Sequence, residues 1–83
     1  MKDVEKVQVV VENLCSIESD ATIPKNVRQR IKVAIDILNA EDRSLSLRID
    51  KSIQELGDVA EDPNVPQYMK MMIWSAVSQL ESK

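Results

Sequence analysis

The sequence predicts an all-α fold in which four antiparallel helices form one compact bundle. Three observations predict it. Apolar residues recur at helical spacing in four segments, short loops separate these segments, and residues 4–41 match residues 46–83 with six identities. Because short loops force successive helices to run in opposite directions, this pattern favours two helical hairpins that pack on each other.

The first helix is expected near residues 3–18, with one wide apolar stripe facing the core. The stripe consists of Val4, Val7, Val10, Val11, Leu14 and Ile17. Val9, Val10 and Val11 are consecutive β-branched residues, which by themselves favour a strand. Their surroundings are charged and helix-periodic, so we expect tertiary packing to override this local propensity.

The second helix is expected near residues 24–40 and the fourth near residues 66–81, each with a proline in its first turn. A proline costs nothing there because the first N–H groups of a helix have no partner within it. The stripe of the second helix is Val27, Ile31, Ala34, Ile35 and Leu38. The stripe of the fourth helix is Met69, Met72, Ile73, Ala76, Val77 and Leu80.

The third helix is expected near residues 44–60. It follows a short charged loop in which Asp42 or Ser44 is the candidate N-cap. Its stripe is Leu45, Ile49, Ile53, Leu56, Val59 and Ala60.

The other two loops, residues 20–24 and 62–66, both begin with Asp and end with Pro. Ile23 and Val65 directly precede these prolines, so we expect their backbone to be extended. An apolar side chain at such a point is free to enter the bundle as the chain turns.

Two helices in about 42 residues, joined by an Asp-x-x-Ile/Val-Pro turn and followed by a basic residue, resemble a HEAT-type helical hairpin. The basic residue is Arg28 in the first half and Lys70 in the second. A solenoid of such hairpins normally needs three or more units, and the chain has two. The resemblance therefore implies two HEAT-like hairpins that close on each other within a single domain of residues 1–83.

A second resemblance covers nearly the whole chain, from Val4 to Ser82. Three segments carry it, residues 23–28, 61–66 and 73–82. Together they are similar to a small family of uncharacterised archaeal proteins of unassigned function. The resemblance implies an all-helical cytoplasmic protein of archaeal origin, and it transfers no catalytic or binding residue.

The composition is that of one small globular domain with an aliphatic core. The 83 residues are 43% hydrophobic and 30% charged, with no Phe, one Tyr and one Trp. Because aromatic rings bury about 150–250 Å² each, a core without them gains less burial per residue, and a partner or self-association would add stability. The net charge of −3 weighs against nonspecific binding to nucleic acid or to an anionic membrane.

Cysteine content and hydropathy indicate a cytoplasmic protein. Cys15 is the only cysteine, which excludes an intramolecular disulfide and fits a reducing compartment. The N-terminus lacks the apolar centre of a signal peptide, and no apolar run approaches the roughly 20 residues that span a bilayer. We therefore expect no membrane contact.

The sequence predicts no enzyme, no cofactor and no metal site. Histidine is absent, which removes the commonest general base and the commonest transition-metal ligand. Cys15 lacks an adjacent base, so we expect it to be structural at the edge of the first stripe. Gly57 is the only glycine, which rules out a glycine-rich phosphate loop. The loop acids lack the alternating spacing of a calcium site, so we expect caps and solvated charge.

Four basic residues near the start of the second helix form the first candidate surface. They are Lys25, Arg28, Arg30 and Lys32. Lys25, Arg28 and Lys32 fall within one arc of about 60° beside the positive end of the helix, which makes them a candidate anion or nucleic-acid face. The alternative is a solvated surface balanced by acids of neighbouring helices, which the absence of interleaved aromatic residues favours.

Trp74, with its neighbours Met71 and Lys70, is the second candidate surface. Trp74 points about 120° away from the centre of the apolar stripe, so an exposed Trp–Met pair would form a contact patch for a protein. The alternative is that Trp74 covers the N-terminal helix as a flank of the core. An exposed patch favours a weak homodimer through the fourth helix, in which Trp74 approaches its symmetry mate or the mate's Met71.

The sequence therefore favours a small helical protein-interaction module without catalytic activity. The alternative is a nucleic-acid or ribonucleoprotein accessory protein that uses Lys25, Arg28 and Lys32. A basic surface unbroken by acidic residues would favour this alternative. Neither the biological process nor the identity of the partner follows from the sequence.

Overall fold

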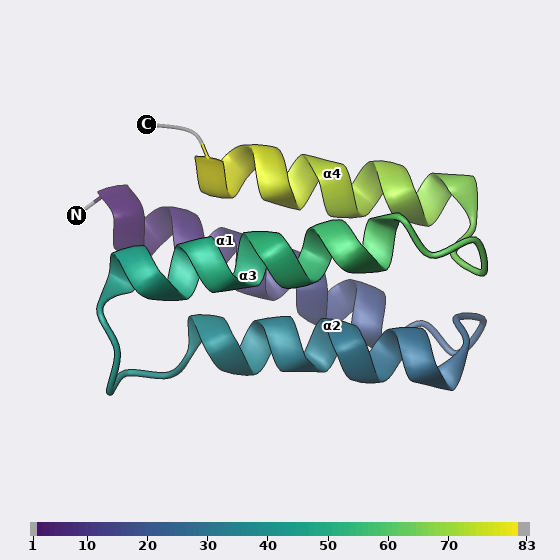
Figure 1. Ribbon diagram of the computed structural model, residues 1–83, viewed down its shortest axis with the longest axis horizontal. Helices are drawn as coiled ribbons and strands as arrows, with labels where there is room; N and C mark the ends of the chain where they lie inside the picture. Colours follow the sequence, from purple (N-terminus) through teal and green to yellow (C-terminus); the bar gives the residue numbers. More distant parts are fainter. Residues whose placement is uncertain (1, 82–83) are drawn as a thin grey trace.

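The structure, a computed structural model, describes the backbone of residues 2–81 and the side chains of residues 5–81. Within that part the chain forms four α-helices and no strand, as the sequence predicts. The helices are α1 (Lys2–Glu18), α2 (Lys25–Leu38), α3 (Leu45–Ala60) and α4 (Gln67–Glu81). In Figure 1 each loop turns the chain back along the preceding helix, so that the start of α1 and the end of α4 lie at the same end of the molecule.

The helices form a closed ring around one core. α1 packs mainly against α2 and α4, and α3 packs mainly against the same two helices. Because α1 meets α4, the two hairpins cover each other's apolar sides. The Cα radius of gyration is 11.9 Å, close to the value of about 12 Å expected for a compact chain of this length. No helix within residues 2–81 has both the length and the apolar character that a membrane crossing requires.

The stripes predicted for α1 and α2 are buried. In α1 the buried residues are Val7, Val10, Val11, Leu14 and Ile17, and in α2 they are Val27, Ile31, Ala34, Ile35 and Leu38. Val4, predicted to begin the first stripe, lies outside the described side chains. Val10 and Val11 are buried while Val9 is 48% exposed. In a strand Val9 and Val11 would share a face, so this burial pattern follows helical packing over β propensity.

The stripe predicted for α3 packs against the core, but its first half is less deeply buried than its second half. Leu45, Ile49 and Ile53 are only partly buried, and Ser52 is fully buried beside them. The Ser52 hydroxyl donates to the Ile49 carbonyl oxygen at 2.9 Å, so its burial leaves the hydroxyl satisfied by its own helix. A small residue here lets the neighbouring helices approach α3 without costing an unpaired polar group.

Three six-residue loops connect the helices, and their backbones follow the same path. They are residues 19–24, 39–44 and 61–66. In each, the first residue donates its N–H to the carbonyl four residues earlier, and the second donates to the carbonyl three residues earlier. The fifth residue donates to the carbonyl of the second, and these bonds all measure 3.0–3.3 Å. The two Asp–Pro loops thus match at an offset of 42, although residues 82–83 of the second copy lie outside the described residues.

The last residue of each loop directly precedes the first residue of the next helix. Pro24 has φ −54° and ψ 143°, and α2 begins at Lys25, so the prediction that the proline lies in the first turn is wrong by one residue. The Pro24 carbonyl accepts the Arg28 N–H at 3.1 Å, and Pro66 has the same place before α4. Proline suits the position because it has no N–H to satisfy and its restricted φ leads into a helix.

The middle loop uses different side chains on the same backbone path. Ser44, one of the two predicted candidates, is the N-cap of α3, and its Oγ accepts the Leu47 N–H at 3.3 Å. Ile23 and Val65 are 2% and 4% exposed, so both enter the core as predicted. Arg43, at the equivalent place in the middle loop, is exposed. The core therefore needs an apolar side chain from only two of the three loops.

We expect Gly57→Ala to stabilise the protein by about 0.5–1 kcal/mol, because glycine in a helix interior costs conformational entropy. Gly57 lies within α3 without a positive φ, and an added Cβ would meet no atom within 4 Å. Thermal unfolding should show a melting temperature higher by several degrees. An unchanged or lower value would mean that the helix is already distorted at this residue.

The Asp20 carboxylate accepts two hydrogen bonds from Thr22. Thr22 Oγ1 donates to Asp20 Oδ1 at 2.7 Å and Thr22 N–H donates to the same oxygen at 2.9 Å. The hydroxyl first, and the N–H second, hold the pKa of Asp20 below its ordinary value. Because the folded pKa is lowered, the resulting stabilisation is present above pH about 4 and is lost as the pH falls through the folded pKa.

Thr22→Val removes the hydroxyl and keeps the N–H. We expect the pKa of Asp20 to rise toward its ordinary value, and the variant to lose stability at pH 7 but not below the folded pKa. Carboxyl ¹³C chemical shifts through an acid titration measure the first effect, and thermal unfolding at both pH values measures the second. Thr22→Ser, which keeps a hydroxyl, is the control. Equal pKa values in both variants would contradict the assignment.

Candidate interaction surface

The described residues do not form a metal centre on which to build a site. Among them no group of three His, Cys, Asp or Glu residues is placed to hold a metal ion. Cys15 is exposed, so the expectation that it packs structurally at the edge of the first stripe is wrong. It lies about 100° around α1 from the buried Leu14, outside the arc that contacts other helices. The remaining candidates are the two surfaces that the sequence predicts.

The structure places Trp74 and Met71 on the surface of α4. Trp74 is 47% exposed and Met71 is 65% exposed, while Lys70 beside them is partly buried. Two further large side chains extend this surface, Tyr68 at 50% and Met72 at 44% exposure. Tyr68, Met71, Met72 and Trp74 together are called the α4 apolar face below.

Sequence reasoning missed half of the α4 apolar face. The sequence predicts Met72 in the core stripe, but Met72 lies about 100° around the helix from the buried Ile73 and is 44% exposed. Tyr68 was not assigned at all. Helical spacing could have indicated Tyr68, because Tyr68 lies one turn before Met71 and Met72 and therefore on the same side of the helix.

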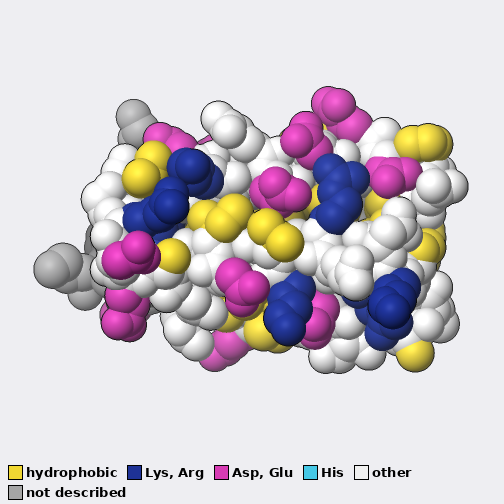
Figure 2. Space-filling model, turned by 60° about the horizontal axis from the view of Figure 1, so that its bottom comes forward, with side chains coloured by type: hydrophobic (Ala, Val, Ile, Leu, Met, Phe, Trp, Pro, Cys, Tyr) yellow, Lys and Arg dark blue, Asp and Glu magenta, His cyan; other side chains and the backbone are white. Residues whose placement is uncertain are grey.

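The α4 apolar face lies on a helix with unusually little charge. From residue 71 to residue 80 there is no Asp, Glu, Lys or Arg. A surface helix normally carries charged or polar residues opposite its buried stripe, whereas a helix that is apolar on all sides is normally buried. The side of the molecule where α2 runs shows the ordinary arrangement, with basic and acidic side chains interspersed (Figure 2). α4 thus exposes large apolar side chains and small uncharged ones, but no charge, over residues 71–80.

A groove between α1 and α4 borders this face. Asn13, Ser16 and Ile17 of α1 line it together with Met71, Met72 and Ser75 of α4. Its volume is about 330 Å³. No side chain lining it is charged, so the uncharged surface of α4 continues onto α1.

The structure also brings the predicted basic residues together. Lys25, Arg28 and Lys32 line one shallow groove of about 190 Å³, with Gln29 between them. Glu18, the last residue of α1, lines the same groove. The basic surface is therefore interrupted by a carboxylate, which sequence reasoning did not place there because Glu18 belongs to the preceding helix.

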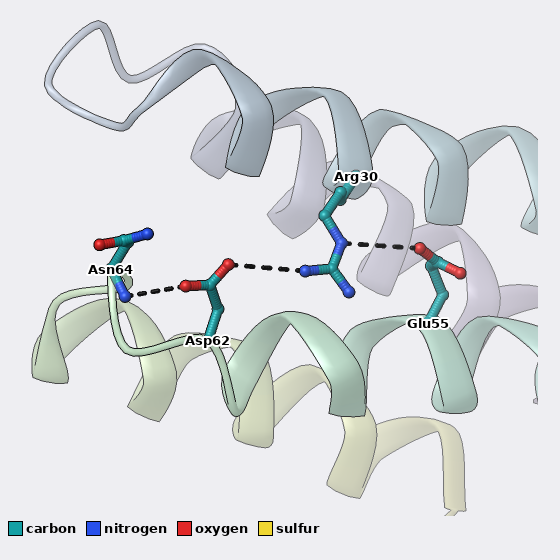
Figure 3. A network of polar contacts seen from close by, with 4 residues as sticks. All are labelled: Arg30, Glu55, Asp62 and Asn64. Atoms are coloured by element: carbon teal, nitrogen blue, oxygen red, sulfur yellow. Dashed lines mark hydrogen bonds and ion pairs between the residues drawn. The ribbon is translucent and has the colours of Figure 1, made fainter.

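Arg30, the fourth basic residue of this segment, takes part in a different structure. Its Nη1 lies 3.6 Å from Asp62 Oδ2, and its Nε lies 4.0 Å from Glu55 Oε1. Asp62 Oδ1 also accepts the Asn64 N–H at 2.8 Å. Figure 3 shows that this network joins α2 to α3 and to the loop before α4. Arg30 is thus neutralised within the protein and adds no free charge to the basic groove.

Fold and surface define the class: small all-α proteins of four helices whose most distinctive surface is apolar. A family profile described as "Uncharacterised protein family (UPF0147)" matches residues 1–82, and the chain belongs to this family.

The relatives and the similar solved structures are of the same kind. A UPF0147 protein of Methanosarcina acetivorans is 40% identical over 78 residues, which are 94% of this chain and 80% of that protein. The crystal structure of the unknown-function protein MMP1188 is similar with a TM-score of 0.89 and 36% identity, over 94% of this chain and 89% of that one. A UPF0147 structure from Thermoplasma acidophilum has a TM-score of 0.88 and 30% identity, over 98% and 96%. The predicted resemblance to an uncharacterised archaeal family is confirmed.

Proposed function

We propose that the chain is a small protein-interaction module that acts in the cytoplasm without catalytic activity, and that the α4 apolar face is its contact surface. One observation carries this proposal. Four large side chains, each about half exposed, lie on a helix with no charged residue between positions 71 and 80. Exposed aromatic and methionine side chains on an uncharged surface are the composition of protein contact sites.

A comparison of two surface variants tests this function. Met71→Glu places a charge in the α4 apolar face, and Leu47→Glu makes the same kind of change on α3, where Leu47 is 41% exposed. In a nuclease-treated native extract, proteins retained by the tagged wild-type chain should be lost with Met71→Glu and kept with Leu47→Glu. Equal retention by both variants would show that the α4 apolar face is not the contact surface.

We also propose that the two antiparallel hairpins are HEAT-type hairpins closed on each other. Loops 19–24 and 61–66 support this, because both have Asp at the second position and Pro at the sixth, where the middle loop has Ala40 and Ser44. A crystal structure superposed on itself, residues 4–41 on 46–83, provides the test. Different interhelical crossing angles in the two hairpins would remove the basis for a duplicated unit.

The alternative function is nucleic-acid binding through Lys25, Arg28 and Lys32. That these three residues line one groove favours it, while Glu18 in the same groove and the absence of an aromatic side chain among its lining residues weigh against it. If the groove binds nucleic acid, a chain with all three residues changed to Glu loses binding, and the wild type weakens steeply with salt. If the wild type does not bind RNA or DNA at low salt, the alternative is excluded.

A further inference from the structure

We infer that the partner of the α4 apolar face is a second copy of this chain, paired antiparallel through α4 about a two-fold axis. The inference rests on the proposed function, because it takes the α4 apolar face as the contact surface. It adds the identity of the partner and the direction in which the two helices run. Three observations carry it: the charges at the ends of α4, the place of Trp74 along the helix, and the exposed area.

The charges at the ends of α4 complement each other in an antiparallel pair. Lys70 and Glu81 are the only charged residues of α4, and they are 11 positions apart. At about 100° per residue they lie on the same flank of the helix, about 16 Å apart along its axis. Neither side chain forms an ion pair with another described residue.

A two-fold axis perpendicular to two antiparallel helices brings the same flank of both helices together and reverses the order of residues. Lys70 of one copy then lies opposite Glu81 of the other, and the pair occurs twice. A parallel pair about a two-fold axis would instead place the two Lys70 side chains at one level and the two Glu81 side chains at another, so no Lys70–Glu81 pair would form. Charge complementarity therefore selects the antiparallel pair, and the chain supplies both members of it.

The same axis places the aromatic residue at the centre of the contact. The midpoint between Lys70 and Glu81 falls between residues 75 and 76, and Trp74 lies about 2 Å from it along the helix. The two Trp74 side chains would therefore approach each other across the axis. Ser75 and Ser78 are small and exposed beside them, so the helices have room to approach closely. The 330 Å³ groove next to Met71 holds the volume of about ten waters, enough for a side chain of the second copy.

The exposed area predicts a weak dimer. The four side chains of the α4 apolar face are each about half exposed, and at roughly 200 Å² per side chain they present about 400 Å². A standard stable interface buries about 800 Å² on each partner. Neighbouring residues of α1 and α4 supply part of the difference. We therefore expect a dissociation constant on the order of 100 μM rather than a permanent dimer.

Sedimentation of the full chain from about 5 μM to about 1 mM tests the inference. The wild type and Leu47→Glu should shift from monomer to dimer, and the single Trp should shift its fluorescence to the blue as the concentration rises. Met71→Glu should remain monomeric at every concentration, with a far-UV spectrum that shows it is folded. Dimerisation of Met71→Glu with wild-type affinity would overturn the inference.

Charge reversal tests the antiparallel arrangement separately. Lys70→Glu or Glu81→Lys alone should weaken dimerisation about tenfold, because each turns two attractive pairs into repulsive ones. The double variant Lys70→Glu with Glu81→Lys should recover an affinity within about threefold of the wild type. A double variant as weak as the single variants would overturn the proposed pairing.

The experiments distinguish a wrong partner from a wrong contact surface. A wild type that stays monomeric to about 1 mM overturns self-pairing. If Met71→Glu then still loses proteins that the wild type and Leu47→Glu retain from extract, the contact surface stands and its partner is another protein. If Met71→Glu loses nothing, both the partner and the function are wrong.

Discussion

Ile31→Ala is expected to lower the free energy of unfolding by about 3 kcal/mol. Ile31 is 0% exposed in α2, which packs against both α1 and α3. Removing three methyl or methylene carbons from an aliphatic core loses their burial and leaves a cavity that rigid helices fill only partly. A chain of this length is stable by about 4–12 kcal/mol, so the variant remains folded and measurable.

Two matched variants isolate the effect of burial. Ile31→Val removes one methylene carbon and should cost about 1 kcal/mol. Val33→Ala lies two residues away on the same helix, and because Val33 is 46% exposed the change should stay within about 0.5 kcal/mol. Urea unfolding of the three variants measures all these values. Equal losses for Ile31→Ala and Val33→Ala would contradict the assignment of Ile31 to the core.

The core of α1 and α2 could be predicted because periodicity alone decides it. Residues such as Leu14 and Ile31 lie near the centre of a wide apolar arc, so a small rotation of the helix leaves them buried. The burial of residues near the edge of an arc depends instead on where the neighbouring helix lies. Met72 and Ile53 are of this kind, and a single sequence does not give the position of the neighbour that leaves Met72 exposed and Ile53 partly buried.

The candidate surfaces could be predicted in part for the same reason. Lys25, Arg28 and Lys32 share an arc of one helix, so their proximity follows from helical geometry. Glu18 reaches the same groove from the end of α1, which depends on the path of the intervening loop. Arg30 points away from this groove to Asp62, a contact across 32 positions that no local pattern indicates.

The equivalence of the middle loop was missed because its side chains differ. The outer loops have Asp at the second position and Pro at the sixth, where the middle loop has Ala40 and Ser44. The backbone bonds are nevertheless the same in all three. The sequence pattern therefore reveals only the side chains that favour this loop conformation. The conformation itself follows from joining two packed helices with six residues.

Arg48 links α3 to the end of α2 across the middle loop. We expect Arg48→Ala to lower the free energy of unfolding by about 2 kcal/mol. Its Nη1 donates to the carbonyl oxygen of Leu38, the last residue of α2, at 3.0 Å. This bond satisfies a carbonyl that has no partner within its helix and places a positive charge at the negative end of the helix dipole. Hydrogen bonds to charged groups contribute about 1.5–3 kcal/mol, more than an exposed ion pair.

Arg48→Lys and Arg43→Ala separate the hydrogen bond from charge in general. Lysine keeps the charge but lacks the planar guanidinium, so we expect a loss of about 1 kcal/mol. Arg43 lies in the same loop and is exposed, so its loss should stay within about 0.5 kcal/mol. Urea unfolding at low and high salt measures each variant. If Arg48→Ala lowers the free energy of unfolding no more than Arg43→Ala does, water replaces the guanidinium at the Leu38 carbonyl. The hydrogen bond then does not stabilise the fold.

A large loss of stability in Arg48→Ala would also affect the interpretation of Arg28 in the basic groove. Arg28 and Lys70 stand four residues after Pro24 and Pro66, as Arg48 stands four residues after Ser44. Nε of Arg28 and Nε of Arg48 are both buried without a hydrogen-bond partner, but only Arg48 donates to the carbonyl oxygen of a preceding helix end. If burial of the guanidinium group, rather than its hydrogen bond, stabilises the loop, Arg28→Ala should destabilise the protein as Arg48→Ala does. Arg28 would then serve the fold, and Lys25 and Lys32 alone would remain for an anionic ligand.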